Sequence, residues 1–256
     1  MLPSKVKERL VLALDVDDFK TAQDLVDKLR DYVKVFKIGN QLFTAEGPRV
    51  IQMIKKKGGE VFLDLKFHDI PNTVARAAEV ATKLGVYIFN VHTSGGLEMM
   101  KSAVEASRNI SLTLGIRKPL ILGVTILTSI NQEILEKEVG IERRLEEQVV
   151  HLAKLAKFAG LEGVIASSRE IKIIRETCGE DFIILTPGMR PMGKLMHDQK
   201  RVMTPREAMR WGADFIVIGR PVREAVDPVE AIKEILKEME GDLKNDAEGR
   251  RNNTKI

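Results

Sequence analysis

Short apolar runs alternate with amphipathic segments along most of this sequence. The runs are rich in Val, Ile, Leu and Phe, and each is followed closely by a polar residue or a glycine, as is typical of buried strands. The segments between them repeat apolar residues at helical spacing, for example Ala22, Val26 and Leu29 after the first run. We therefore predict strands within residues 10–15, 33–38, 61–67, 86–91, 120–127, 163–166, 182–185 and 215–218.

The segments after the strands carry recognisable helix starts. Thr204, Pro205 and Glu207 stand at the offsets of an N-cap, a first-turn proline and a capping-box acid. We expect the last helix to end at Gly241, because glycine commonly follows the end of a helix. Three segments lack a helical or strand pattern, and we expect a loop at 39–47, an irregular segment at 186–203 and a flexible polar tail at 242–256.

Eight strands that alternate with eight helices predict an α/β protein whose sheet is parallel and covered by helices. The 256 residues suit a single (β/α)₈ TIM barrel, a fold that typically needs about 250 residues. We expect residues 1–241 to form this one domain. An open, doubly wound sheet is the structural alternative.

The amino-acid composition argues against nucleic acid and membranes as binding partners. The 41 Lys and Arg residues are interleaved with 37 Asp and Glu, so the net charge of +4 describes a solvated surface and gives no concentrated basic face for nucleic acid. A modest attraction for anionic small molecules remains. The single cysteine, Cys178, allows no intrachain disulfide, and the early apolar run is too short for a signal peptide or membrane span. We expect a cytoplasmic protein without membrane partners.

The stretch 61–73, VFLDLKFHDIPNT, places charged groups at the end of a strand and the start of a helix. Alternation along a strand puts Asp64 and Lys66 on one face and Leu65 on the other. Asp69 follows at the strand exit, where its default role is to cap the helix that Pro71 begins. The pattern is a strand, a charged turn and a helix.

Polar residues stand at the ends of the other predicted strands as well. In a (β/α)₈ barrel these ends meet at one face, which carries the functional site. Charges at such a mouth are costly unless they are paired, so we expect Lys37, Asp64 and Lys66 to be neighbours of alternating sign. A purely structural set of ion pairs is the alternative. The strand-end residues are Asp15, Lys37, Asp64, Lys66, His92, Thr128, Arg190, Gly219 and Arg220.

The loops after the seventh and eighth strands suggest a phosphate site. Gly188 and Gly219 let backbone N–H groups approach an anion, and Arg190 and Arg220 supply guanidinium groups that bind two oxygens at once. A turn glycine beside a solvated arginine explains Gly219 and Arg220 equally well. The histidines show no metal-ligand spacing, and we expect no metal site.

Several motifs together resemble the orotidine 5′-monophosphate decarboxylase family. They are Asp64-x-Lys66-x-x-Asp69 within LDLKFHDIPNT, the upstream FKIG with Lys37, and the later VTILTS, PGMRP, DQKR and IGRP, in order from about residue 10 to 221. The resemblance implies a (β/α)₈ barrel that decarboxylates orotidine 5′-monophosphate to uridine 5′-monophosphate, the last step of pyrimidine nucleotide synthesis. It also implies a homodimer with shared active sites and no metal or organic cofactor.

The same resemblance implies roles for individual residues. Lys66 would donate the proton, within a charged array of Lys37, Asp64 and Lys66, and Asp69 with Thr73 would reach into the partner's site. The remaining implied contacts are Asp15 and Lys37 to the ribose, Thr128 near the pyrimidine, and Arg190, Gln199, Gly219 and Arg220 at the phosphate.

Two rival functions share parts of this pattern. A sugar-phosphate lyase such as 3-keto-gulonate 6-phosphate decarboxylase resembles the Asp-x-Lys-x-x-Asp motif but uses Mg²⁺, with a glutamate at the position of Lys37. A lysine there repels a divalent cation, so Lys37 favours the metal-free nucleotide enzyme. A phosphate-binding barrel without catalytic activity is the second rival, and it has no need of Lys66.

Overall fold

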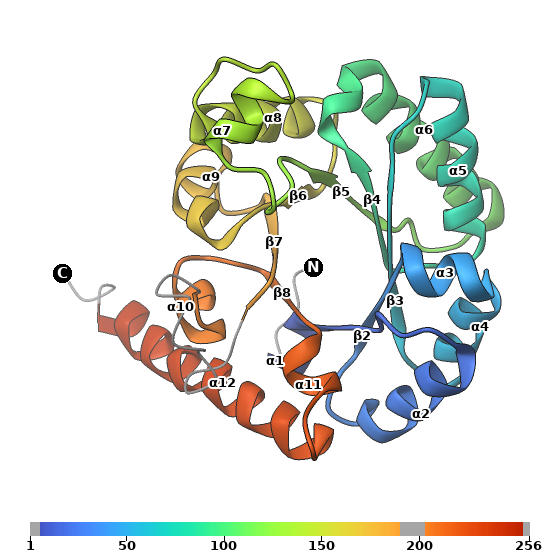
Figure 1. Ribbon diagram of the computed structural model, residues 1–256, viewed down its shortest axis with the longest axis vertical. Helices are drawn as coiled ribbons and strands as arrows, with labels where there is room; N and C mark the ends of the chain where they lie inside the picture. Colours follow the sequence, from blue (N-terminus) through green and yellow to red (C-terminus); the bar gives the residue numbers. More distant parts are fainter. Residues whose placement is uncertain (1–5, 190–202, 253–256) are drawn as a thin grey trace.

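The computed structural model describes residues 6–189 and 203–252, with side chains as far as residue 240. Eight parallel strands form a closed barrel in sequence order, because β1 (Leu10–Ala13) pairs with both β2 (Val35–Gly39) and β8 (Phe215–Ile218). Figure 1 shows the helices arranged around the outside of this barrel. The predicted (β/α)₈ fold is confirmed, and the open-sheet alternative is excluded.

Seven strands begin and end within two residues of their predicted bounds, and the fifth ends three residues earlier than predicted. The remaining strands are β3 (Glu60–Phe67), β4 (Ile88–His92), β5 (Leu120–Val124), β6 (Gly163–Ile165) and β7 (Ile183–Pro187). The helices are α1 (Val6–Arg9), α2 (Phe19–Leu29), α3 (Asn40–Glu46), α4 (Arg49–Lys56), α5 (Pro71–Lys83), α6 (Gly96–Leu114), α7 (Gln132–Lys137), α8 (Leu145–Phe158), α9 (Ile171–Cys178), α10 (Pro205–Arg210), α11 (Arg220–Arg223) and α12 (Pro228–Asn252), with short 3₁₀ turns at Thr93–Gly95 and Ser168–Glu170.

Strand alternation divides the apolar side chains into two cores. One fills the barrel and includes Val11, Phe62, Leu122 and Phe215, whereas the larger one lies between the strands and the helices. Residues two positions further along an inward row stay on the inside. Val11 and Ala13 are therefore followed by Asp15 at the mouth of the barrel, above the apolar filling.

The predicted helix starts are confirmed. Pro71 begins α5, and Pro205 begins α10 behind a complete capping box, in which Thr204 and Glu207 each accept from the other's backbone N–H. The capping box satisfies N–H groups at the start of α10 that have no partner within the helix. At α5 the N-cap residue is Ile70 and no side chain caps the helix, so the default capping role expected of Asp69 is wrong.

Two predictions about segment structure are wrong. Residues 40–46 form the helix α3, which buries only Leu42 fully and is too short to produce a recognisable helical period. The last helix does not end at Gly241, because α12 continues to Asn252. The helix α11 lies near its start, and α10 lies further along it, where Arg206 donates to the Glu238 carbonyl (Figure 1). A glycine inside a helix costs only about 1 kcal/mol, and Leu, Lys, Ala, Glu and Arg among the following residues favour helix. The division into a barrel domain and a flexible tail stays a prediction.

Among the helices that the structure describes, none is long and apolar enough to cross a membrane.

Candidate active site

Lys37 lies at the centre of a chain of alternating charges at the barrel mouth. Its Nζ is 2.8 Å from Asp15 Oδ1 and 3.2 Å from Asp64 Oδ2, and Asp64 Oδ1 is 2.6 Å from Lys66 Nζ. The glycine after Ile38 leaves room for this pair, because a Cβ on Gly39 would lie 3.0 Å from Lys37 Nζ and 3.2 Å from Asp15 Oδ1. The predicted grouping of Lys37, Asp64 and Lys66 is present, and Asp15 extends it.

The backbone of β3 leaves regular strand geometry at this array. Leu63 pairs with Phe89 and Phe67 with Val91, so the register shifts between them, and Lys66 has a φ of 53°. Left-handed backbone is unfavourable for a residue with a side chain, and such strain persists only where the surrounding structure enforces it. Lys66 therefore meets Asp64 through a bulge, where the sequence had suggested simple alternation.

Asn90 is a site residue that sequence reasoning missed. Its side chain, fully buried within β4, accepts a hydrogen bond from the Lys66 N–H and donates one to Asp64 Oδ1. A polar residue inside the apolar run VYIFNV was the available indication, because buried amides need partners.

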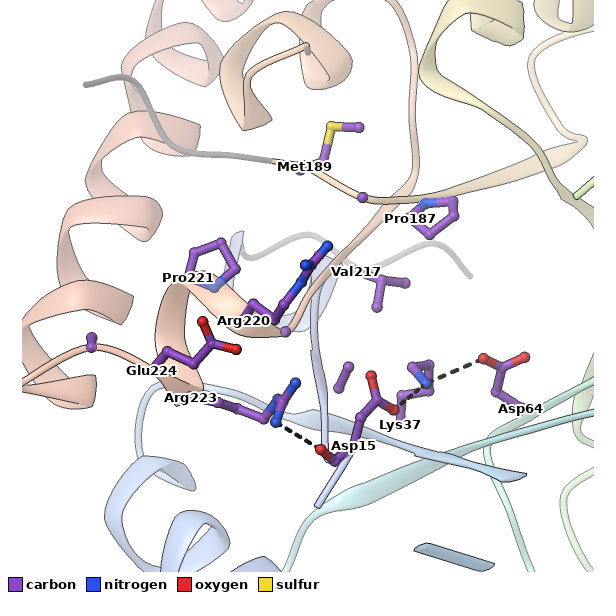
Figure 2. Close-up of a pocket in the computed structure, with 14 residues that line it drawn as sticks. Asp15, Lys37, Asp64, Pro187, Met189, Val217, Arg220, Pro221, Arg223 and Glu224 are labelled. Atoms are coloured by element: carbon purple, nitrogen blue, oxygen red, sulfur yellow. Dashed lines mark hydrogen bonds and ion pairs between the residues drawn. The ribbon is translucent and has the colours of Figure 1, made fainter. Parts of the chain in front are cut away.

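Two adjoining cavities open above the charges. The larger, about 600 Å³, is lined by Asp15, Lys37 and Asp64 on one side and by the segments after β7 and β8 on the other (Figure 2). The smaller, about 210 Å³, is lined mainly by apolar residues such as Ile126 and Leu185, together with Lys66 and Thr128. Lys37 and Asp64 line both cavities, so one elongated ligand can contact the charges from both sides.

The segment after β8 supplies the basic side of the larger cavity. Gly219 ends the strand and Arg220 begins α11, and both line the cavity with Gly188 from the end of β7. Arg223, which the sequence analysis did not select, donates to the Asp15 backbone carbonyl at 2.7 Å and ties α11 to the end of β1 (Figure 2). A guanidinium and exposed backbone at this position suit a phosphate group.

His92 ends β4 next to the array. Its ring centroid lies 5.2 Å from that of His68. Burial lowers the pKa of His92, and the nearby His68 and Lys66 lower it further, with Asp64 opposing them. The neutral imidazole is therefore favoured at neutral pH, which makes His92 a rim residue with no added positive charge.

Two of the predicted site residues that the structure describes do not line these cavities. Asp69 and Thr73 are exposed at the start of α5, where Asp69 accepts a hydrogen bond from the Ile70 N–H at 2.6 Å. Arg190 and Gln199 lie outside the described residues. Among the described residues, no group of three His, Cys, Asp or Glu side chains is arranged to hold a metal ion.

The fold and the site together define a class: a (β/α)₈ barrel with an alternating lysine–aspartate array beneath a mouth lined by Arg220 and Arg223. A sequence model of the orotidine 5′-phosphate decarboxylase / HUMPS family matches residues 8–235, and the chain belongs to that family. The resemblance noted in the sequence is thereby confirmed.

Individual relatives agree with this assignment. The chain is 51% identical over 240 residues to an orotidine 5′-phosphate decarboxylase of Moorella thermoacetica, covering 94% of this chain and 95% of the relative. It is 54% identical over 235 residues to one of Syntrophotalea carbinolica, covering 92% and 96%. The crystal structure of orotidine 5′-phosphate decarboxylase from Lactobacillus acidophilus superposes with a TM-score of 0.80 at 39% identity, covering 91% of this chain and 99% of that one.

Proposed function

We propose that this protein is a carboxy-lyase that converts orotidine 5′-monophosphate to uridine 5′-monophosphate and CO₂, the last step of de novo pyrimidine nucleotide synthesis. The observation that carries the proposal is the alternating array of Lys37, Asp64 and Lys66 beneath two joined cavities. Family membership and relatives named orotidine 5′-phosphate decarboxylase support the same reaction.

The reaction sets a specific electrostatic problem. Breaking the bond from C6 of the pyrimidine to its carboxylate leaves an electron pair in the plane of the ring, where the π system does not delocalise it. An ammonium group held beside C6 stabilises that negative charge and then transfers a proton to it. Lys66 has this role in our proposal, because Asp64 fixes its ammonium at the cavity wall.

Asp64 acts on the substrate as well as on Lys66. Its carboxylate lines both cavities, so the substrate carboxylate approaches a like charge that disappears as CO₂ leaves. That repulsion favours departure of CO₂ over the bound ground state. Lys37, 3.2 Å away, holds Asp64 in place at the same time.

The two cavities suit different parts of the nucleotide. The smaller one combines apolar walls with Thr128 and Lys66 and suits the pyrimidine ring. The larger one offers Asp15 and Lys37 to ribose hydroxyls, and Gly219 and Arg220 to the phosphate. Arg190 and Gln199, outside the described residues, complete the proposed phosphate contacts. Phosphate binding far from C6 supplies free energy that holds the ring against the array.

We infer that the active unit is a homodimer in which Asp69 and Thr73 enter the neighbouring site. Both side chains are exposed at the start of α5, and the adjacent Ile70 exposes 67% of its surface. These exposed side chains would be covered if the start of α5 packed against a second chain. The exposed acid and threonine thus support a role outside their own barrel.

The reaction in this proposal uses no metal or organic cofactor and takes place in the cytoplasm. Lys37 lies 3.2 Å from Asp64, so the ammonium occupies the place where a divalent cation would need further oxygen ligands. The single cysteine of the chain suits a reducing compartment. The nucleotide, with its phosphate and carboxylate, is the only small-molecule partner required.

The test is an ultraviolet assay of orotidine 5′-monophosphate consumption by purified protein, with EDTA and with added Mg²⁺. We expect equal turnover in both conditions. Loss of turnover in EDTA that Mg²⁺ restores would instead favour metal-dependent chemistry, and 3-keto-gulonate 6-phosphate serves as the competing substrate in the same experiment. Turnover of that sugar phosphate without turnover of the nucleotide would overturn the proposal.

A further inference from the structure

Asn90 occupies a position in the barrel where an apolar residue would be expected. It lies between Ile88 and His92 on the inward row of β4, and its relative exposure is 0%. Leu122 stands opposite it on β5, in regular register. On the other side, β3 carries the bulge that contains Asp64 and Lys66. Asn90 is therefore the polar residue of β4 that faces the irregular part of the neighbouring strand.

The bulge removes a backbone partner, and Asn90 replaces it. In a regular parallel ladder the N–H groups of β3 donate to carbonyls of a neighbouring strand. Within the register shift, the Lys66 N–H donates instead to Asn90 Oδ1 at 2.8 Å. A buried N–H without an acceptor is costly, so this side-chain bond allows the bulge to persist.

The two partners fix the orientation of the amide. The Lys66 N–H can only donate and the Asp64 carboxylate can only accept, so Oδ1 must face Lys66 and Nδ2 must face Asp64, 2.7 Å away. The reversed amide would place the Nδ2 donor against the Lys66 N–H and the Oδ1 acceptor against the Asp64 carboxylate. One rigid group thus holds the backbone of Lys66 and the carboxylate of Asp64 in a single relative position.

We propose that Asn90 is a positioning residue that keeps the Lys66 backbone left-handed and so holds the Lys66 ammonium at the place where it delivers its proton. This inference rests on the proposed function, because it assigns a role relative to proton donation by Lys66. Asp64 Oδ1 receives both Asn90 Nδ2 and Lys66 Nζ, while Oδ2 faces Lys37. Without Asn90, the strained φ of 53° at Lys66 loses the bond that opposes relaxation.

An Asn90→Asp variant gives a pH-dependent version of the same contact. A protonated carboxyl group accepts from Lys66 N–H and donates to Asp64, as the amide does, whereas the ionised group repels Asp64. The titratable groups around it are Asp64 and Lys66 on β3, Lys37 on β2 and the neutral His92 on β4, while β5 presents the uncharged Leu122. Activity relative to wild type is therefore expected to be highest at low pH and to fall as pH rises.

The experiment compares Asn90→Leu, Asn90→Asp and a control, Thr82→Val. Thr82 is also fully buried and makes two side-chain hydrogen bonds, to the Ala78 carbonyl and to Ser107, within α5 and α6. Orotidine 5′-monophosphate turnover, uridine 5′-monophosphate binding and thermal unfolding are measured for each protein. Wild-type turnover comes first, since its absence would refute the proposed function and not the role of Asn90.

For Asn90→Leu we expect kcat to fall about tenfold to a hundredfold while nucleotide binding changes less than about threefold. Thr82→Val is expected to lower thermal stability and to retain kcat. The relative kcat of Asn90→Asp is expected to fall as pH rises. An unchanged kcat in Asn90→Leu would overturn the inference. So would a fall in kcat accompanied by an equally large loss of nucleotide affinity and by a loss of thermal stability. If the leucine variant does not fold, the pH profile of Asn90→Asp decides, and a flat relative profile would overturn it.

Discussion

Lys37 reaches diagonally from β2 to Asp64 on β3, and the two side chains form an ion pair of 3.2 Å although Phe62 is the residue opposite Lys37 in register. The same ammonium lies 2.8 Å from Asp15, two residues after the end of β1. One cation therefore compensates carboxylates on both sides of β2. Removing it leaves two acids facing each other at a partly enclosed site.

This arrangement predicts a large loss of stability in Lys37→Met. Only 11% of the Lys37 side chain and 13% of the Asp64 side chain are exposed. Asp64 keeps Lys66 as a counter-ion in the variant, but breaking a buried ion pair by removing one partner costs about 3 kcal/mol. Urea unfolding at neutral pH measures the loss. The control is Lys137→Met, which breaks the exposed pair with Glu133 and is expected to change stability by less than about 0.5 kcal/mol. Equal effects of the two substitutions would show that Lys37 is not the shared partner.

Arg220→Ala is predicted to weaken binding of uridine 5′-monophosphate by about tenfold to a hundredfold, because a guanidinium on a phosphate makes strong charge-assisted hydrogen bonds. Binding of uridine, which lacks the phosphate, is expected to stay the same. Calorimetry with both ligands separates the two effects. Arg108→Ala, on the exposed surface of α6, serves as the control. A parallel loss for both ligands would place Arg220 outside the phosphate site.

The shared-site proposal predicts recovery of activity on mixing two inactive variants. Asp69→Ala keeps Lys66, and Lys66→Ala keeps Asp69, so a hybrid dimer has one site with both residues. Statistical exchange of subunits then restores about a quarter of the wild-type activity, because a two-fold dimer has two equivalent sites. Each variant alone is the control. No recovery after subunit exchange has been verified by mass spectrometry would argue that Asp69 acts within its own chain.

The buried carboxylate of Glu170, which lies after β6 and outside the charged array, is predicted to make the stability of the fold depend on pH. This carboxylate accepts the Ser167 N–H at 2.9 Å in a capping box after β6. Burial raises the pKa of Glu170 from 4.5 to about 7, an effect that the Ser167 N–H opposes and Glu146 reinforces. The raised pKa stabilises the fold fully below pH 4.5, and this contribution is lost as pH rises through about 7.

Glu170→Gln removes that titration and keeps an acceptor for the Ser167 N–H. Relative to wild type, we expect its free energy of unfolding to increase by about 2 kcal/mol between about pH 5 and about pH 8. Urea unfolding at both pH values provides the measurement. The exposed Glu105→Gln on α6 is the control and is expected to show no such change. A difference between Glu170→Gln and wild type that does not depend on pH would contradict the raised pKa.

The sequence predicted the barrel and the charged array because both depend on simple periodicities. Parallel strands of a barrel end at one face, so Asp15, Lys37 and Asp64 had to approach one another once the strands were assigned. Proline and capping residues marked the starts of α5 and α10 equally well. These features need only local sequence and strand order.

Other features depend on contacts that periodicity does not encode. The bulge in β3 needs Asn90 on a different strand to complete its hydrogen bonds, so neither residue indicates it alone. The helix α3 contains a single fully buried residue, Leu42, which leaves almost no amphipathic pattern to read. In our proposal, the exposed Asp69 acts only in the site of a second chain. Context beyond the local segment decides each of these cases.

The most direct test of the central claim is turnover of orotidine 5′-monophosphate by Lys66→Ala, with binding of uridine 5′-monophosphate measured on the same preparation. Lys66 Nζ, 2.6 Å from Asp64, is the proposed proton donor at the cavity wall. We predict that the variant binds the nucleotide product within about tenfold of wild type and loses at least about a thousandfold in kcat. Turnover close to the wild-type rate would contradict the account.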